Sequence, residues 1–312
     1  SDVYKRQKLI HAGKRHKIRS LPHLGIWLWL LLCIPCLLAS CGNDDDEKEK
    51  GLSVSLSWTN EADKGTEVKD VKIWIFNAGK DSLVEEKHYG SAEEMASQRF
   101  QLPEGTYRIL TTTNLSEPFF IKEQTRALSS WNNILIGLTN PKDVKNNAYF
   151  GVTDVKIDNK EGSQVVKNPI RSVLSELTII IENVPKGTEM NGKALDCAGC
   201  LFPTQKNSDG DYGLPGIEPT EVELPTILST GSTLQSEVIR LMPNILGSQA
   251  SHIYLRLLLP NATLLEYDIT APVMKAGGKY ELRFKLEEMQ PKIYLESDIN
   301  NWKDLNKEVE IK

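Results

Sequence analysis

Residues 52–58, Leu-Ser-Val-Ser-Leu-Ser-Trp, alternate apolar and polar side chains without a break. Successive side chains of an extended chain point to opposite faces, so this stretch predicts a strand with one buried and one polar face. Val71, Ile73 and Ile75 repeat the pattern, and similar runs recur at intervals of about 8–12 residues between turns that contain Gly, Pro or Asn. The sequence therefore predicts an all-β protein made of antiparallel sandwiches.

The chain is long enough for two such sandwiches. It has 312 residues, of which 40% are apolar and 25% are charged, as in an ordinary globular protein. A turn at residues 183–187, Asn-Val-Pro-Lys-Gly, divides the strand-rich part into residues 52–182 and residues 187–312. Each part is large enough for its own core, so we expect two tandem β-sandwich domains.

Charge is distributed unevenly along the chain. Residues 1–40 hold seven basic residues and one acidic residue. Residues 41–312 hold 30 Lys and Arg against 41 Asp and Glu, which is a net charge of −11. Because such an acidic body repels a phosphate backbone, nucleic acid is not an expected partner.

Residues 1–40 have the order of an export signal. A basic block at residues 14–19 precedes an apolar run at residues 24–38, which is shorter than the roughly 20 residues that a membrane span needs. The run ends in Leu38-Ala39-Ser40-Cys41, which resembles the lipobox of bacterial lipoproteins. That resemblance implies cleavage before Cys41 and lipidation of its sulfur with diacylglycerol, which carries fatty acyl chains such as palmitate. An uncleaved anchor helix with a chance cysteine is the alternative.

Two flanking segments are excluded from the predicted fold. Residues 1–7 resemble read-through translation at the edge of a gene fragment. Residues 41–51 form an acidic tether that is too polar to pack. The tether also resembles the acidic signal that directs lipoproteins of Bacteroidetes to the cell surface, and both interpretations stay open.

Four further segments carry a resemblance to a known family. They are residues 71–79, residues 102–110 with Asn114 after them, residues 149–152 and residues 171–179. In this order, behind a lipobox, they resemble the fimbrillin-like superfamily of Bacteroidales. The greatest similarity is to the lipidated anchor subunits of type V fimbriae.

The resemblance implies a specific architecture and role. The fold would be two transthyretin-like β-sandwiches, and the protein would be a non-enzymatic fimbrial subunit, lipid-anchored in the outer membrane and exposed at the cell surface. Its partners would be fimbrial stalk subunits. Subunits of this family join by strand addition, in which unpaired N–H and C=O groups at a sheet edge accept a neighbour's strand.

Two features favour an anchor over a stalk subunit. The first strand begins soon after Cys41, and no Arg lies between that strand and the body to suit an Arg-directed maturation cut; the basic residues there are Lys64, Lys69 and Lys72. One departure is that anchor subunits often carry a second Cys close to the lipidated one, whereas the next Cys here is Cys197.

The alternative function is a glycan-binding surface lipoprotein of a polysaccharide-uptake system. Such a protein would hold sugar rings on exposed aromatic side chains. Trp58 shares the apolar face of its strand, which predicts core packing. Trp74 points away from Ile73 and Ile75, so it is the better candidate for an exposed aromatic, although it could equally lie beneath an adjoining strand.

Cys197-Ala198-Gly199-Cys200 is a CxxC motif. Only His88 and His252 follow Cys41, and a zinc site needs about four ligands, so a zinc site is weakly supported. In the oxidising cell envelope we expect a local disulfide between Cys197 and Cys200, with free thiols as the alternative.

The remaining motifs do not predict chemistry. Asp81-Ser82-Leu83 resembles an O-glycosylation acceptor triplet of Bacteroidetes at Ser82, and a solvated loop is the alternative. Residues 207–218 match part of a calcium-loop template but have Tyr212 where the template needs Gly. The sequence has no G-x-S-x-G and no phosphate-binding loop, so we expect no catalytic site, no metal and no cofactor.

Overall fold

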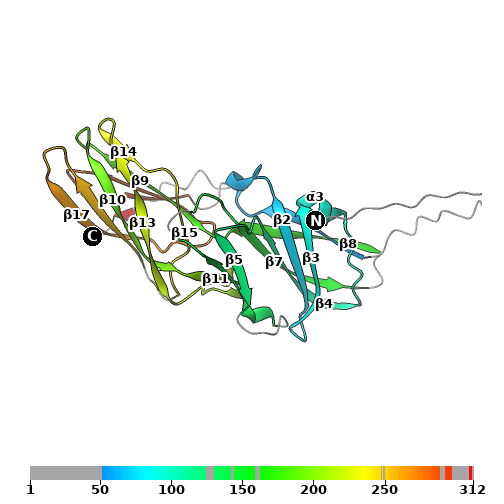
Figure 1. Cartoon of the computed structure of the whole chain (residues 1–312). Helices are drawn as coiled ribbons and strands as arrows, with labels where there is room; N and C mark the ends of the chain where they lie inside the picture. Colours follow the sequence, from blue (N-terminus) through cyan, green and yellow to red (C-terminus); the bar gives the residue numbers. More distant parts are fainter. Residues whose placement is uncertain are drawn as a thin grey trace, which may run out of the picture. The chain divides into compact units, whose positions relative to one another are not determined.

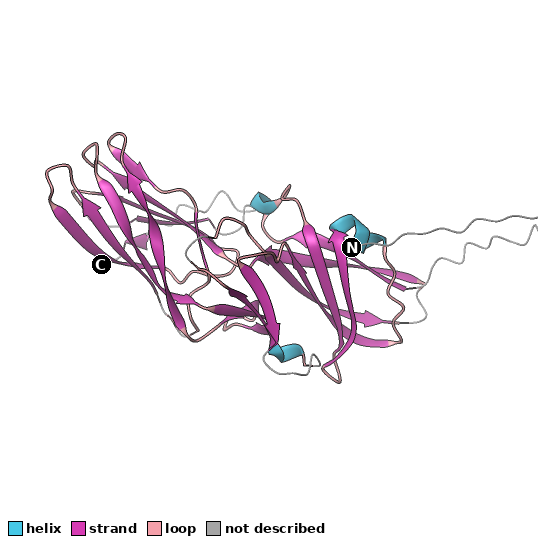
Figure 2. Cartoon of the chain, in the orientation of Figure 1, coloured by secondary structure: helices cyan, strands magenta, loops and turns pink. Residues whose placement is uncertain are grey.

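The computed structural model describes residues 51–123, 130–141, 144–158, 162–246, 248, 250–288, 292–296 and 309–310. These residues belong to one compact unit, residues 48–312. Strands make up most of it, and the described part contains one α-helix, α3 (Ala92–Ser97) (Figure 2). The predicted all-β class is therefore confirmed. None of the helices in this part is long and apolar enough to span a bilayer.

Sheet A contains the first strand that the sequence predicts. β1 pairs in parallel with β8, and the other neighbouring strands are antiparallel (Figure 1). The helix α3 begins where the hydroxyl of Ser91 accepts a hydrogen bond from the amide of Glu94, and it buries Met95. In spatial order, the strands of sheet A are β1 (Gly51–Trp58), β8 (Ser163–Ser172), β7 (Tyr149–Ile157), β4 (Gly105–Thr113), β2 (Lys69–Asn77) and β3 (Ser82–Ser91).

Sheet B packs against one face of sheet A. Two short 3₁₀ helices accompany the pair of sheets, η1 (Glu61–Asp63) after β1 and η2 (Trp131–Asn133) before β6. In spatial order, the strands of sheet B are β12 (Tyr212–Pro215), β11 (Cys200–Lys206), β6 (Ile134–Leu138) and β5 (Phe119–Glu123). The first sandwich therefore draws strands from two distant parts of the chain.

Sheets C and D form the second sandwich. In spatial order, the strands of sheet C are β14 (Thr233–Gln235), β9 (Ser175–Glu182), β18 (Lys279–Lys285), β19 (Lys292–Glu296) and β20 (Val309–Glu310), and β15 (Ile239–Leu241) also pairs with β9. The strands of sheet D are β13 (Pro219–Leu228), β10 (Glu189–Ala198), β16 (Ser251–Leu258) and β17 (Leu264–Ala271). Their shared core is aliphatic and includes Leu177, Ile253 and Leu282, each with no exposed side-chain area.

Two segments pair outside the half of the chain to which the sequence assigned them. β9 precedes residues 183–187, yet it lies in sheet C and buries Leu177, Ile179 and Ile181 in the second core. The hairpin of β11 and β12 follows that turn, yet it pairs with β6 of the first sandwich. The chain passes from sheet D to sheet B between Ala198 and Cys200.

Of the two alternatives for Trp74, an exposed aromatic or a residue covered by neighbouring strands, the structure shows the second. Its side chain is only 5% exposed and packs with Phe76 and Trp131 between sheets A and B. Ile73 and Ile75 are buried on the opposite face of the same strand, where α3 and Phe100 contribute to another cluster. Both faces of β2 are therefore buried, one against sheet B and the other against α3 and Phe100. In a sandwich of two layers alone, the second face would be polar and exposed to solvent.

Candidate functional site

The predicted lipidation site lies outside the described residues. It comprises Leu38, Ala39, Ser40 and Cys41, and the first described residue, Gly51, opens β1. Leu52 and Val54 on this strand are buried, and Leu52 exchanges backbone hydrogen bonds with Phe100 across the edge that β8 does not cover. The body therefore holds the start of β1 from both sides.

The candidate glycosylation residue Ser82 starts β3, just after the turn between β2 and β3. It is partly exposed and pairs with Asn77 across the ladder. The preceding Asp81 has a φ of 49° and accepts a hydrogen bond from Arg108 at 2.9 Å. Ser82 is thus accessible at the edge of sheet A, and its modification remains a prediction.

The two cysteines of the CxxC motif belong to different sheets. Cys197 is the next-to-last residue of β10 and lies in the core between sheets C and D, whereas Cys200 opens β11 in sheet B. Both thiols are free in the structure, so the expected disulfide is not formed there. Burial raises the pKa of the Cys197 thiol to about 12, with a smaller effect from Asp196. That thiol stays protonated at neutral pH and packs as a small apolar group.

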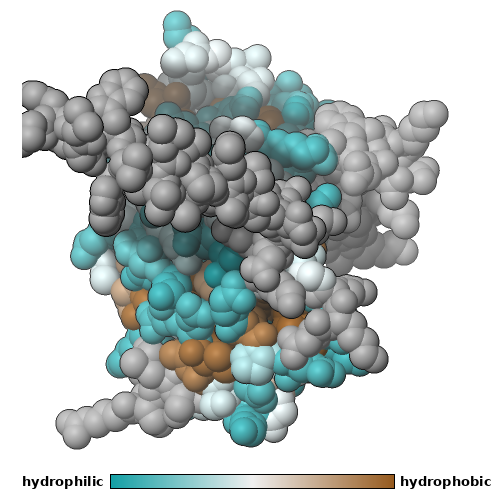
Figure 3. All heavy atoms as spheres, turned by 90° about the vertical axis from the view of Figure 1, so that its right-hand side faces the viewer, coloured by the Kyte–Doolittle hydropathy of each residue, from teal (hydrophilic) through white to brown (hydrophobic). Residues whose placement is uncertain are grey.

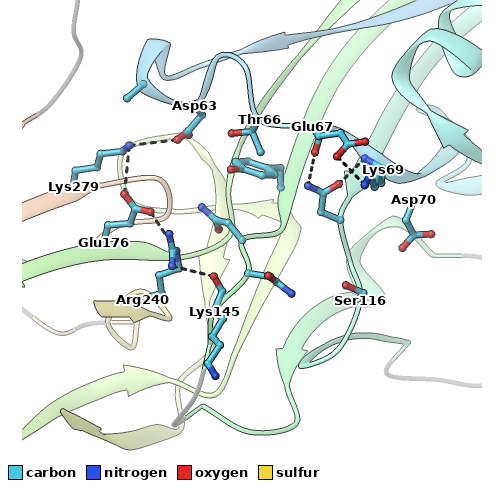
Figure 4. A pocket seen from close by; sticks show the side chains of 15 residues that line it. Asp63, Thr66, Glu67, Lys69, Asp70, Ser116, Lys145, Glu176, Arg240 and Lys279 are labelled. Atoms are coloured by element: carbon cyan, nitrogen blue, oxygen red, sulfur yellow. Dashed lines mark hydrogen bonds and ion pairs between the residues drawn. The ribbon is translucent and has the colours of Figure 1, made fainter. Parts of the chain in front are cut away.

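A polar cavity of about 770 Å³ lies where β9, β15 and β18 approach the loop after β1 (Figure 4). Glu176 on β9 is the register partner of both Arg240 on β15 and Lys279 on β18. Their side chains form a row across sheet C, with Glu176 lying 3.4 Å from each cation. Asp63 in η1 lies 3.4 Å from the ammonium of Lys279 and extends the row into the first sandwich.

The row is largely shielded from solvent. The side chain of Asp63 is 9% exposed and that of Lys279 is 23% exposed. Burial raises the pKa of Asp63, and the attraction of Lys279 opposes this shift without cancelling it. Burial works against the charge of Lys279, but the attraction of Glu176 and Asp63 outweighs it and raises that pKa. The cluster therefore ties the two sandwiches together through charge.

No local signal in the sequence identified this cluster. Asp63 and Lys279 are separated by 216 positions, and each lies among other charged residues that do not distinguish it, such as Lys64 and Glu281. The cavity is also lined by Glu67 and Asp70, and each of its four carboxylates contacts a basic side chain, so it does not present the converging free acids that a hydrolase would need.

The partial calcium template is occupied by internal contacts. Asp209 accepts a hydrogen bond from Lys275 at 2.6 Å, and Asp211 lies 3.9 Å from Arg171. The side-chain oxygen of Asn207 accepts hydrogen bonds from the backbone amides of Asp209 and Asp211. Among the described residues, no group of three or more His, Cys, Asp or Glu side chains is placed to hold a metal ion.

The aromatic residues do not form a sugar-binding platform in the described part. Trp131 is 3% exposed, and Trp58 packs edge-on against Tyr149 with ring centroids 4.9 Å apart. The large apolar side chains that this part exposes are all Val, Ile or Leu. Figure 3, which faces the right-hand end of Figure 1, shows mainly hydrophilic residues around a smaller apolar area. The glycan-binding alternative therefore gains no support from these residues.

The sheet margins differ in how well they are protected against pairing. β3 has a register shift that leaves Val84 unpaired, and it carries charged side chains at residues 85–88. β13 has two register shifts and contains Pro219 and Pro225. β14 and β15 have three residues each. Bulges, prolines, charges and short length all discourage the addition of a strand.

β17 has no bulge and no proline and is not short, and its charged side chains are Glu266 and Asp268. Its eight residues pair with β16 at every position without a shift, and it contains neither Pro nor Lys. It lies at the margin of sheet D, drawn in orange in Figure 1. Among the described strands, β16 is the one that pairs with it.

A family model described as fimbrillin-A associated anchor proteins Mfa1 and Mfa2 matches residues 43–305. The chain belongs to this anchor family. The match spans both sandwiches and includes every described strand except β20. The resemblance to fimbrillin-like anchor subunits that the sequence motifs carried is thereby confirmed.

Solved structures with the same fold accompany this family assignment. The fimbrial anchor protein Mfa2 from Porphyromonas gingivalis is 11% identical, with a TM-score of 0.51 over 79% of this chain and 96% of that one. A candidate adhesin from Bacteroides thetaiotaomicron is 10% identical, with a TM-score of 0.54 over 80% and 96%. A candidate polysaccharide-binding protein from the same species is 10% identical, with a TM-score of 0.52 over 80% and 96%.

At these identities the likenesses establish a shared fold for this anchor-family member. A search of the curated proteins found no match to the chain.

Proposed function

We propose that this protein is a lipid-anchored subunit that attaches a fimbrium to the outer membrane and recruits stalk subunits by β-strand addition. The observation that carries the proposal is the anchor-family match over residues 43–305. The match begins two residues after Cys41, at the base of the acidic tether. The sequence before it supplies the lipobox, and the sequence within it supplies the two sandwiches.

The geometry at the start of the body suits an anchor. A lipid attached to Cys41 would be joined to Gly51 by a segment that can span up to about 35 Å when fully extended. Pulling force on that segment would reach β1, whose eight residues all pair with β8. The buried side chains of Leu52 and Val54 add resistance to extraction of this strand. Stable anchoring needs more than one acyl chain, which lipidation of an N-terminal Cys provides.

The test is a comparison of the wild-type protein with the Cys41→Ser variant in cells. We expect a palmitate analogue to label the wild-type protein, which should fractionate with the outer membrane and retain fimbriae on the cell. Cys41→Ser should lose the label and release fimbriae into the medium. The matched control is Cys200→Ser, which removes a thiol from the body and should keep both label and fimbriae.

Two results would contradict the proposal. A mature protein that begins after residue 60 would lack both the lipid and β1. Retention of the label by Cys41→Ser would place the lipid elsewhere.

A further inference from the structure

The open margin of β17 is the strongest unassigned feature of the surface. The turn between β16 and β17 closes with a hydrogen bond from the amide of Leu259 to the carbonyl of Thr263. In an antiparallel ladder, hydrogen-bonded and non-hydrogen-bonded pairs alternate, and this ladder has no shift over its eight pairs. Residues 264, 266, 268 and 270 therefore direct their N–H and C=O groups away from β16, toward the open margin.

The side chains beside this margin define a chemical pattern. Leu265 and Tyr267 are partly buried against the second core, so apolar side chains of an added strand would cover them further. Glu266 and Asp268 lie on the other face, and both are exposed. Glu266 pairs with Arg256 at 3.2 Å, whereas Asp268 has His252 at 3.7 Å as its ion-pair neighbour. The side chain of Asp268 is 72% exposed, so its negative charge lies at the margin.

An exposed leucine row continues this face at one end. Leu264 pairs in register with Leu258, and Glu189 lies between Leu258 and Leu228 in the same row across sheet D. The three leucines are 42–61% exposed. On this face, a strand added beside β17 would therefore contact the apolar side chain of Leu264 and the acidic side chains of Glu266 and Asp268.

We propose that β17 is a docking edge for an extended segment of another protein in which apolar and basic residues alternate. This inference deepens the proposed function, because it names the edge at which strand addition occurs, and it rests on that function. The free backbone groups would give affinity, and the alternating side chains would give register and specificity. The basic residues would pair with Glu266 and Asp268, and the apolar residues would cover Leu265 and Tyr267.

The experiment measures binding of a synthetic peptide of about eight residues, the length of β17, in which valine and lysine alternate. The control peptide has the same sequence with methyl groups on alternate backbone nitrogens, which blocks strand pairing and keeps the charge. We expect fluorescence anisotropy to show binding of the first peptide to the full chain and at least about tenfold weaker binding of the second.

Two variants of Asp268 distinguish the contribution of backbone hydrogen bonding to peptide binding from that of the negative charge. Asp268→Pro removes an N–H that points to the open margin, which is where an edge strand tolerates proline. It should weaken peptide binding by about tenfold or more. Asp268→Asn keeps the N–H and removes the charge, and it should weaken binding less. Far-UV and near-UV circular dichroism should confirm that both variants are folded.

The methylated peptide keeps the test decisive if Asp268→Pro fails to fold. Equal binding of the two peptides to the wild-type chain would overturn the inference and indicate general attraction to an acidic protein. Absence of binding by the unmethylated peptide would also overturn it. Either result would leave the anchor role standing, since that role is tested by lipidation of Cys41 and retention of fimbriae.

Discussion

Replacement of Lys279 by Met tests whether charge ties the two sandwiches together. Met keeps the length of the side chain but removes the cation that lies 3.4 Å from both Asp63 and Glu176. Glu176 keeps Arg240 as a partner, so the loss falls mainly on Asp63, whose side chain is 9% exposed. Leaving a buried charge without its partner costs about 3–5 kcal/mol, and the partial exposure of Lys279 lowers the expected cost to about 2–3 kcal/mol.

The measurement is thermal unfolding by calorimetry. For a body of this size, about 2–3 kcal/mol corresponds to a fall in Tm of roughly 5–10 °C. The matched control is Lys193→Met, which breaks an exposed ion pair with Glu221 at 3.0 Å and should leave Tm nearly unchanged. The double variant Asp63→Asn/Lys279→Met removes both charges and should recover about 1–2 kcal/mol of the loss.

The pH dependence gives the reasoning a second check. Burial already raises the pKa of Asp63 above the ordinary value of 3.8, and removal of Lys279 raises it further. A carboxyl whose folded-state pKa is raised destabilises the fold when it is ionised, and this penalty is relieved as the pH falls through that pKa. The Tm difference between wild type and Lys279→Met should therefore narrow as the pH falls from 7 toward 3.8. A difference that is constant with pH, or equal to that of Lys193→Met, would refute the argument.

Three further outcomes follow from the packing. Gly192→Ala should prevent folding, because a Cβ there would lie 2.1 Å from the carbonyl oxygen of Tyr254. Gly231→Ala is the control and should change the urea midpoint of unfolding little, because no atom lies within 4 Å of its Cβ. Cys197 should resist iodoacetamide at pH 8 until urea unfolds the protein, since its pKa is raised to about 12; mass spectrometry of the alkylated peptides checks this. A fragment of residues 51–174 should show no cooperative unfolding, because it lacks the hairpin that completes sheet B; a sharp urea transition would contradict this.

Alternation of apolar residues was sufficient to predict the fold class. Residues 52–58 and 71–76 are strands, as the alternation of their apolar residues predicts, although Ser53 and Trp74 are buried as well. Alternation alone left the place of Trp74 open, because the face of β2 opposite Ile73 and Ile75 could be either solvated or covered by another layer. The run Ile73-Trp74-Ile75-Phe76 is apolar throughout, which is the pattern of a strand covered on both faces. That signal was present in the sequence and favoured burial.

Periodicity does not reveal which sheet a strand joins. Leu177 on β9 and Leu201 on β11 are both fully buried, and their neighbours alternate in the same way. β9 nevertheless joins the second sandwich and β11 joins the first. Pairing depends on contacts between distant segments, so the exchange of strands between the two halves is a property of the folded chain.

The ion row of sheet C shows how strand pairing creates a site that the separate segments do not encode. In the parallel ladder of β9 and β18, Glu176 pairs with Lys279 and Leu177 pairs with Tyr280. A slip of one residue would turn the charged row toward the core and move Leu177 toward Asp63. Burial of Leu177 and neutralisation of Glu176 therefore require the same register. Asp63 contacts the ammonium of Lys279 when β9 and β18 pair in this register. The contact between Asp63 and Lys279 therefore couples correct strand pairing in sheet C to attachment of the first sandwich.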